Sequence, residues 1–383
     1  MIVTGAVVLA LVCFVIAWRL HVGRRTNLPQ PLPEPFIEEE AAPVAGRIVA
    51  PAVPVTSAVP ETAEGPLTRA QIFTRLAELA FGVAPLRAPN EEEFVIIERG
   101  ARAVLEKVAS EPRYAPRRPL LLPQLMRAVN DDEISGRELA RIIARDPSLA
   151  GSLLKLANSS FYKVSDRPVE SVDRAVAVLG MNGLRSLLAT VLMQPVFRLN
   201  AAQFARFPEI AWEHTYRSAA AAEAHAAIVE DNDPFAAQLL GLTFGLGTIV
   251  IFRVALDQYA ARPGGKPKAA VIFRLLQRHA APVARSIAAS WELTDRILDA
   301  LADQDAAPDV RPATALGRSL LFGRLTGALA LLYSQKLISE PTAKSSILAT
   351  GASASHFERI WGRLTLKPVA GEPVRGPGGT RIG

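Results

Sequence analysis

The segment SGRELARIIARDPSLAGSLLKLANSSFY, residues 135–162, decides the fold. Its apolar residues recur every three to four positions, which is the period of a helix packed on one side. Ser135 followed by Glu138 is typical of a capping box, and Asp146 before Pro147 marks the start of a second helix. Two successive amphipathic helices are therefore predicted here.

The same period continues toward the C-terminus. VESVDRAVAVLG (169–180) and MNGLRSLLATVLMQPVF (181–197) read as two helices divided at Gly180. Alternating, strand-like runs are almost absent from residue 67 onward. The predicted fold class is therefore all-α, a multi-helical bundle.

Helices are also predicted on both sides of this bundle. A two-helix N-terminal extension over 67–117 comprises LTRAQIFTRLAELAFG, with Thr68 as N-cap and Gly82 as the end, and EEEFVIIERGARAVLEKVAS (91–110). After the bundle, residues 306–366 contain two amphipathic helices, VRPATALGRSLLFGRLTGALALLYSQ and EPTAKSSILATGASASHFERIWGRL. The first is apolar on most faces, so it packs on the domain or forms a homodimer contact. Residues 367–383 are rich in Gly and Pro, and a disordered tail is predicted there.

A membrane anchor is predicted over residues 1–25. Residues 2–18 carry no charge, and their seventeen residues give a helix of roughly 25 Å, at the short end of what crosses a bilayer. Trp18 ends this stretch, and Arg19, Arg24 and Arg25 come after it. Basic residues on this side predict that the C-terminal side of the helix lies in the cytoplasm. A cleaved signal peptide would need basic residues before the apolar core and a small-x-small site after it, and neither is present. The expected location is the bacterial inner membrane, single-pass, with the bulk of the chain cytoplasmic.

Residues 26–66 differ sharply in composition. Nine prolines and an acidic run, Glu38 to Glu40, punctuate them, and such a stretch buries too little apolar surface to fold. A Pro-rich disordered linker is predicted between anchor and domain.

Charge and cysteine content exclude several classes of protein. The net charge is +6 and the sequence pI about 9.7, yet no run of Lys or Arg exceeds two residues. Nucleic acid is therefore not the expected partner. The single cysteine, Cys13, lies in the apolar N-terminal stretch, which rules out a disulfide within the chain and a Cys-based zinc site.

A second uncharged stretch, Pro234 to Phe252, has two interpretations. Its nineteen residues are long enough for a membrane span. Pro234, Gly241, Gly245 and Gly247 predict instead two short helices in a buried core. A span here would also separate the two halves of one domain, so the buried core is preferred.

The helical segments together resemble the HDOD domain, a bacterial regulatory relative of the HD superfamily of metal phosphohydrolases. The matching pieces are LPQLMRAVND (122–131), ELARIIARDPSLAGSLLKLANSSFY (138–162) and VESVDRAVAVLGMNGLRSLL (169–188), followed by Trp212-Glu213-His214 and Trp291. The resemblance covers residues 118–305 and implies a bundle whose buried centre includes the stretch from Pro234.

In catalytic relatives, the resemblance implies metals held by a His, a His-Asp doublet and later His or Asp residues. Here Phe244-Gly245 stand at the doublet and Gln304-Asp305 near the end, while His214 remains. A Phe ring and a Gly offer no ligand. His225, eleven residues after His214, is roughly 16 Å away along a helix, too far to share a metal.

The remaining polar candidates read as structural. His279 and His356 lie in helical contexts with arginines nearby and no acidic partner expected around them. Asp131-Asp132 and Asp231-x-Asp233 lie at helix junctions and read as caps. No catalytic residue, cofactor-binding residue or metal ligand is assigned, and no cofactor is expected.

The resemblance, together with these losses, implies a membrane-tethered, non-catalytic HDOD signalling or scaffold protein. It would bind protein partners, or a small ligand, in bacterial signal transduction. The alternative is a divergent metal-dependent phosphohydrolase acting on a cyclic dinucleotide or another phosphoester.

Overall fold

Helices are the only regular secondary structure in the described part of the chain, which confirms the all-α prediction. The computed structural model describes residues 65–116, 118, 143, 147–158, 167–193, 203–305 and 310–365. The predicted anchor (1–25), nearly all of the predicted linker (26–66) and the predicted tail (367–383) lie outside the described residues. So do the predicted capping box of Ser135 and Glu138, residues 122–131 and the Asp131-Asp132 doublet.

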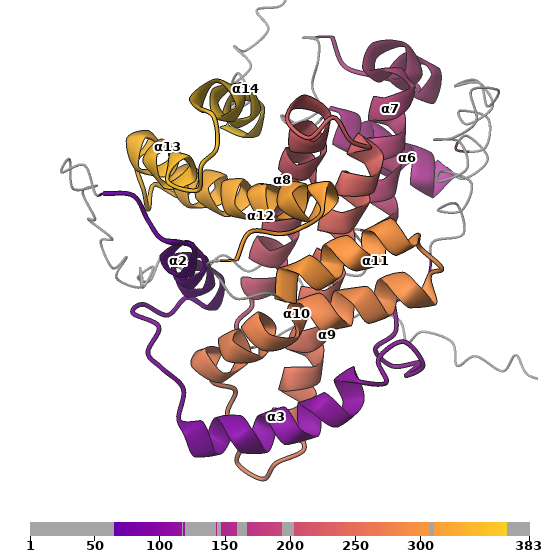
Figure 1. The fold of residues 1–383 in the computed structure, drawn as a ribbon. Coiled ribbons are helices and arrows are strands. Elements are labelled where there is room, and N and C mark those ends of the chain that lie inside the picture. The colour runs from indigo at the N-terminus through magenta and orange to yellow at the C-terminus, as the bar shows by residue number, and fades with distance from the viewer. Residues whose placement is uncertain are drawn as a thin grey trace, which may run out of the picture. The chain divides into compact units, whose positions relative to one another are not determined.

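The described residues all fall within one compact unit. Its elements in chain order are α2 (Arg69–Phe81), α3 (Glu91–Leu105), α6 (Pro147–Ala157), α7 (Val172–Met193), α8 (Phe207–Ile228), α9 (Pro234–Ala260), α10 (Ala269–Ser290), α11 (Asp295–Ala302), the short 3₁₀ helix η2 (Asp303–Asp305), α12 (Ala315–Ser334), α13 (Glu340–Leu348) and α14 (Ala354–Thr365) (Figure 1).

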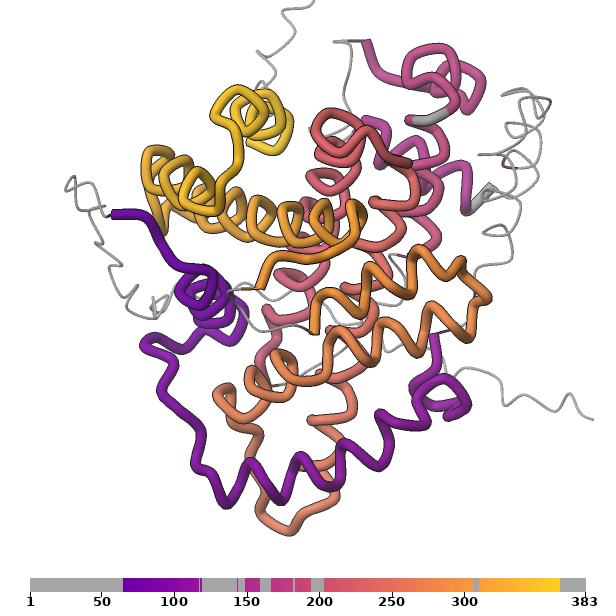
Figure 2. The backbone as a smooth tube through the Cα atoms, in the orientation of Figure 1, coloured from indigo at the N-terminus to yellow at the C-terminus, as the bar shows by residue number. Residues whose placement is uncertain are grey.

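Both helices of the N-terminal extension form. Thr68 and Gln71 make a reciprocal capping box at the start of α2, and Gly82 ends it in the left-handed conformation with φ 67°. The chain then runs to α3, which packs against α9 and α10 (Figure 2).

The second helix of the extension is shorter than predicted. α3 ends at Leu105 rather than Ser110, because the N–H groups of Lys107 and Val108 donate to carbonyls only three residues back. This tighter bonding pattern turns the chain instead of extending the helix.

The predicted division at Gly180 is confirmed. Gly180 has φ 69° and ψ −179°, which no helical residue adopts, so α7 consists of two helical parts joined at this residue. Before α7, the side chain of Asn158 accepts from Val169 N at 2.7 Å and donates to the Val169 carbonyl at 2.8 Å. These bonds tie the end of α6 to the segment that leads into α7.

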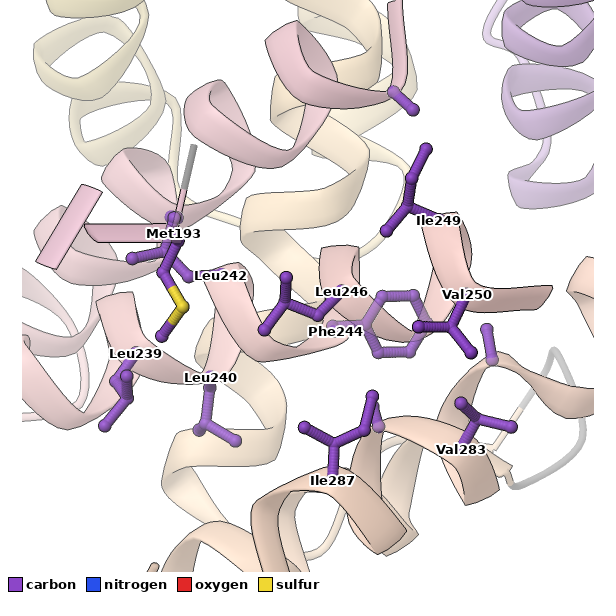
Figure 3. Packing of buried hydrophobic residues seen from close by; sticks show 14 of the residues in the cluster. Met193, Leu239, Leu240, Leu242, Phe244, Leu246, Ile249, Val250, Val283 and Ile287 are labelled. Atoms are coloured by element: carbon purple, nitrogen blue, oxygen red, sulfur yellow. The ribbon is translucent and has the colours of Figure 1, made fainter. Parts of the chain in front are cut away.

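The hydrophobic core lies around α9. Nearly every residue of its first five turns is buried, on all faces of the helix. Figure 3 shows Leu240 and Phe244 of α9 on the side of the core where α10 contributes Val283 and Ile287. α8 covers another face of α9, and α12 packs against α8.

The stretch from Pro234 is one continuous helix, not the two short helices predicted. Pro234 lies in the first turn, where its missing N–H costs nothing, and the Asp233 side chain caps this end by accepting from Ala236 N at 3.1 Å. The expectation that Asp233 is a cap is thereby confirmed.

The glycines of α9 serve close packing rather than breaking the helix. A Cβ at Gly241 would lie 2.6 Å from Ala219 Cα, and one at Gly245 would lie 2.2 Å from Thr215 Oγ1, both on α8. Such distances are far below van der Waals contact, so α8 can approach this closely only because side chains are absent here.

The C-terminal region packs on the domain. α12 lies against α8 and supplies buried residues along most of its length. The last predicted helix is instead two, α13 and α14, because Gly351 has φ 86° and turns the chain between them.

α9 and α12 are each long and apolar enough to cross a membrane, and in that sense the fold is consistent with a membrane association. In the structure, however, 83% of the apolar window of α9 and 78% of that of α12 are buried. Packing within the bundle thus accounts for their composition, as expected for the stretch from Pro234.

Candidate functional site

A cavity of about 470 Å³ lies between α2, α8, α9, α10, η2 and α12. Most of its wall is apolar, including Phe73, Phe81, Phe207, Phe244, Phe273 and Leu276. Its polar side chains are Arg69, His214, Thr248, Gln277, Arg278, Gln304, Asp305 and Arg324.

The positions at which the resemblance placed the altered metal centre meet in this cavity. His214 comes from α8, Phe244 from α9, and Gln304 and Asp305 from η2. Arg324 of α12, 110 positions after His214, lines the same cavity, so residues far apart in the sequence are gathered into one site.

His214 is held in one orientation. Its Nε2 lies 3.0 Å from the backbone carbonyl oxygen of Arg324, and because a carbonyl only accepts, Nε2 carries the proton. Its ring meets that of Phe73 edge-on, with centroids 6.4 Å apart. Burial lowers the pKa of His214 to about 4, so the ring is neutral at physiological pH.

The guanidinium group of Arg324 lies among these residues. Its central carbon is 3.9 Å from the ring centroid of Phe244 and 5.0 Å from that of Phe73, both within cation–π range. Nη1 donates to Gln304 Oε1 at 3.0 Å, and the Gln304 amide in turn donates to the Gly317 carbonyl at 2.9 Å. The group is therefore fixed by two aromatic faces and one amide.

The charge of Arg324 has no ion-pair partner among the described residues. Its buried Nε also lacks a hydrogen-bond partner there. Burial, together with the nearby positive charge of Arg69, lowers the pKa of Arg324 to about 9. Asp305, which also lines the cavity, is exposed and forms no ion pair with it among those the structure records. The site is thus electropositive at its buried centre.

The residues present do not fit the metal centre of catalytic HD proteins. No group of three or more His, Cys, Asp or Glu side chains in the described ranges is arranged to hold a metal ion. Nε2 of His214 is engaged by a carbonyl, and a carboxylate at position 245 would collide with Thr215. A fixed guanidinium beside His214 would in addition repel a cation.

Among the described residues, His225, His279 and His356 do not line this cavity. His225 stacks on Phe322 with ring centroids 4.3 Å apart, and its Nδ1 lies 3.1 Å from Ser319 Oγ. His225 lies on α8, eleven residues after His214, and does not line the cavity.

The interpretation of His279 as lacking an acidic partner is wrong. Its Nε2 lies 3.3 Å from an oxygen of Glu98, which also pairs with Arg278 at 3.0 Å. Glu98 belongs to α3, 181 positions earlier, so spacing along the sequence gave no sign of the pair.

A partly buried acid lies outside the cavity. Glu223 of α8 accepts a hydrogen bond from Ser186 Oγ at 2.8 Å. Burial raises its pKa to about 7, although that hydrogen bond and the charge of Arg363 act in the opposite direction.

Arg324 and Arg69 were not identified from the sequence. Arg324 is the one charged residue between Ser319 and Ser334, a stretch of α12 that is mostly apolar. A lone charge in such a stretch is a usable signal, because a buried helix carries one only where its surroundings accommodate it.

Comparison with known proteins gives a family match. Residues 115–307 match the HDOD domain family, close to the range 118–305 over which the resemblance was seen. A comparison with curated proteins finds no match.

Several solved structures are similar. They include a candidate metal-dependent phosphohydrolase from Shewanella amazonensis SB2B (17% identity, 70% of this chain and 99% of that chain, TM-score 0.48). An HDOD domain protein with unknown function from Geobacter sulfurreducens shows 19% identity over 72% of this chain and 99% of its own, with TM-score 0.46. A candidate signal transduction protein from Marinobacter aquaeolei VT8 shows 16% identity over 74% and 68%, with TM-score 0.44. At these identities and TM-scores the likenesses carry no argument about activity.

Proposed function

The chain belongs to the HDOD family, and from this premise we propose that it is a non-catalytic regulatory protein of bacterial signal transduction. Its helical domain binds one or more protein partners. Residues 2–18 hold it at the inner membrane in a single pass, with the domain in the cytoplasm. This tether raises the effective concentration of the domain for partners in the same membrane.

One observation carries the non-catalytic assignment. The Arg324 guanidinium lies against Phe244 and donates to Gln304, and His214 is bonded to the backbone carbonyl of the same residue, where the family's metal chemistry would need a cation and several donors. Metal-assisted hydrolysis requires O or N donors around the ion and an open coordination position for water. His214 and Asp305 are the only imidazole and carboxylate among the described residues that line the cavity, and two such groups do not make up that set.

The test uses the full-length chain purified in lipid nanodiscs. Bound metal is measured by mass spectrometry, and hydrolysis of bis(p-nitrophenyl) phosphate and of a cyclic dinucleotide is followed with added Mn²⁺, Mg²⁺, Fe²⁺ or Zn²⁺. We expect substoichiometric metal and no turnover above that of empty nanodiscs.

Turnover that accompanies stoichiometric metal would instead favour the alternative, a divergent phosphohydrolase. His214→Ala is the matched variant for this outcome. Activity that belongs to this centre disappears in it, whereas activity of a contaminant persists.

Two further measurements address tether and partners. Deletion of residues 1–25 should release the chain into the soluble fraction. A truncated chain that stays in the membrane would contradict the single tether and point to α9 or α12. Crosslinking in native membranes, compared between the full-length and truncated chains, identifies partners whose capture depends on the tether.

A further inference from the structure

We infer that the cavity around Arg324 is a binding site for a small amphipathic organic anion, with its anionic group against Arg324 and its apolar body among the phenylalanines. This inference goes beyond the proposed function, which assigns no ligand to the domain. It rests on the charge, the shape and the fixed geometry of the cavity.

The first observation is an uncompensated charge. A buried guanidinium is costly unless an anion or a full set of hydrogen bonds accompanies it. Arg324 makes one side-chain hydrogen bond, to Gln304, and its Nε has no partner among the described residues. The second cation nearby, Arg69, increases the repulsion, as the lowered pKa of Arg324 reflects. A bound anion would supply the charge that the described residues do not.

The second observation is the composition of the wall. Five phenylalanines line the cavity, and its volume of about 470 Å³ is in the range typical of sites for small organic molecules. An inorganic anion would leave these rings against water. An anion with a flat apolar body would satisfy the cation and the rings together.

The third observation is that the cation is already in position. Phe244 and Phe73 hold the guanidinium plane, and Gln304 is itself fixed by the Gly317 carbonyl. A ligand therefore does not have to order this side chain, which lowers the entropic cost of binding. Arg278, at the cavity edge, is neutralised by Glu98, so the buried centre rather than the rim selects for negative charge.

The test compares two probes that share one shape. Binding of 2-naphthoate and of its neutral counterpart 2-naphthamide to the full-length chain in nanodiscs is measured by calorimetry, with empty nanodiscs as blank. We expect naphthoate to bind about tenfold or more tightly than naphthamide. Equal affinities, or no binding of naphthoate, would overturn the inference on the unaltered protein alone.

Variants then assign the preference to one residue. Arg324→Met should remove the preference for naphthoate while binding of naphthamide changes little, and Arg324→Lys should retain part of it. Arg359→Met, an exposed arginine on α14, serves as the matched control and should change neither affinity. A preference that survives in Arg324→Met, with the fold verified by circular dichroism, would contradict the role of this residue.

The outcome is separable from that of the metal assay. Selective binding of naphthoate without turnover supports both proposals. Turnover with stoichiometric metal overturns the non-catalytic assignment whatever the probes show, and equal probe affinities overturn the ligand site whatever the metal assay shows.

Discussion

The close packing of α12 on α8 predicts that an added side chain at Gly323 lowers the free energy of unfolding. A Cβ at Gly323 would lie 2.4 Å from the Ser218 carbonyl oxygen and 2.8 Å from Ala222 Cβ. Neither atom is the end of a flexible side chain, so Gly323→Ala forces the two helices apart. Overpacking of this kind costs about 1–3 kcal/mol, whereas alanine gains about 0.5–1 kcal/mol over glycine as a helix former. The net expectation is a loss of about 1–2 kcal/mol in the free energy of unfolding.

The assay is denaturant unfolding followed by tryptophan fluorescence and by circular dichroism. The matched control is Gly362→Ala in α14, where an added Cβ meets no atom within 4 Å. This control should gain up to about 1 kcal/mol, because only the helix propensity changes. If both variants are stabilised alike, the helices are not packed as closely as the structure indicates. Since Arg324 directly follows Gly323, displacement of α12 should also weaken naphthoate binding.

Three further predictions concern charge and the limits of the domain. The pKa of Glu223 is raised to about 7, so its contribution to stability is present below pH 4.5 and is lost as pH rises through 7. Glu223→Gln should therefore raise the free energy of unfolding at pH 8, by at most about 3 kcal/mol, and change it much less at pH 4.5. Unfolding curves at the two pH values measure this difference. Arg324→Met should raise the free energy of unfolding by about 1–2 kcal/mol, because it removes a partly buried charge without an ion pair among the described residues. Arg318→Met should instead lower it by about 1–3 kcal/mol, because it leaves Glu230 without its bidentate partner. Equal losses in both variants would contradict this account of Arg324. A fragment of residues 115–305 should be poorly soluble and largely unfolded by circular dichroism, because it lacks α12 and exposes the apolar surface that α12 covers. A fragment of residues 65–365 should give a soluble helical domain. If the shorter fragment is well folded, α12 is dispensable.

The sequence predicted best what depends on neighbouring residues alone. The caps of α2, the break at Gly180 and the cap at Asp233 were all readable, because a cap or a left-handed glycine acts within one helical turn. The family resemblance located the altered centre at His214 and Phe244, and the cavity brings both together.

What the sequence missed depends on contacts between distant segments. Whether a glycine inside α9 ends the helix or lets another helix approach depends on what packs against it. At Gly241 the packing residue is Ala219, on the preceding helix. The contact between His214 and Arg324 spans 110 positions, and α2 and α12, which complete the cavity, lie outside the residues that match the family. No local pattern encodes such contacts.

Arg324 connects the two proposals. A helix that served packing alone would gain stability from Leu or Met at this position, since a buried charge without an ion pair is a cost. Where a sequence keeps such a destabilising residue, a functional role is expected to offset the loss of stability. At this site one positive charge has two consequences: it stands where a metal ion would be repelled, and it attracts an organic anion into a cavity lined by aromatic rings. Arg324→Met should therefore stabilise the domain and at the same time abolish its preference for naphthoate over naphthamide. A substitution at a purely structural position would not have both effects.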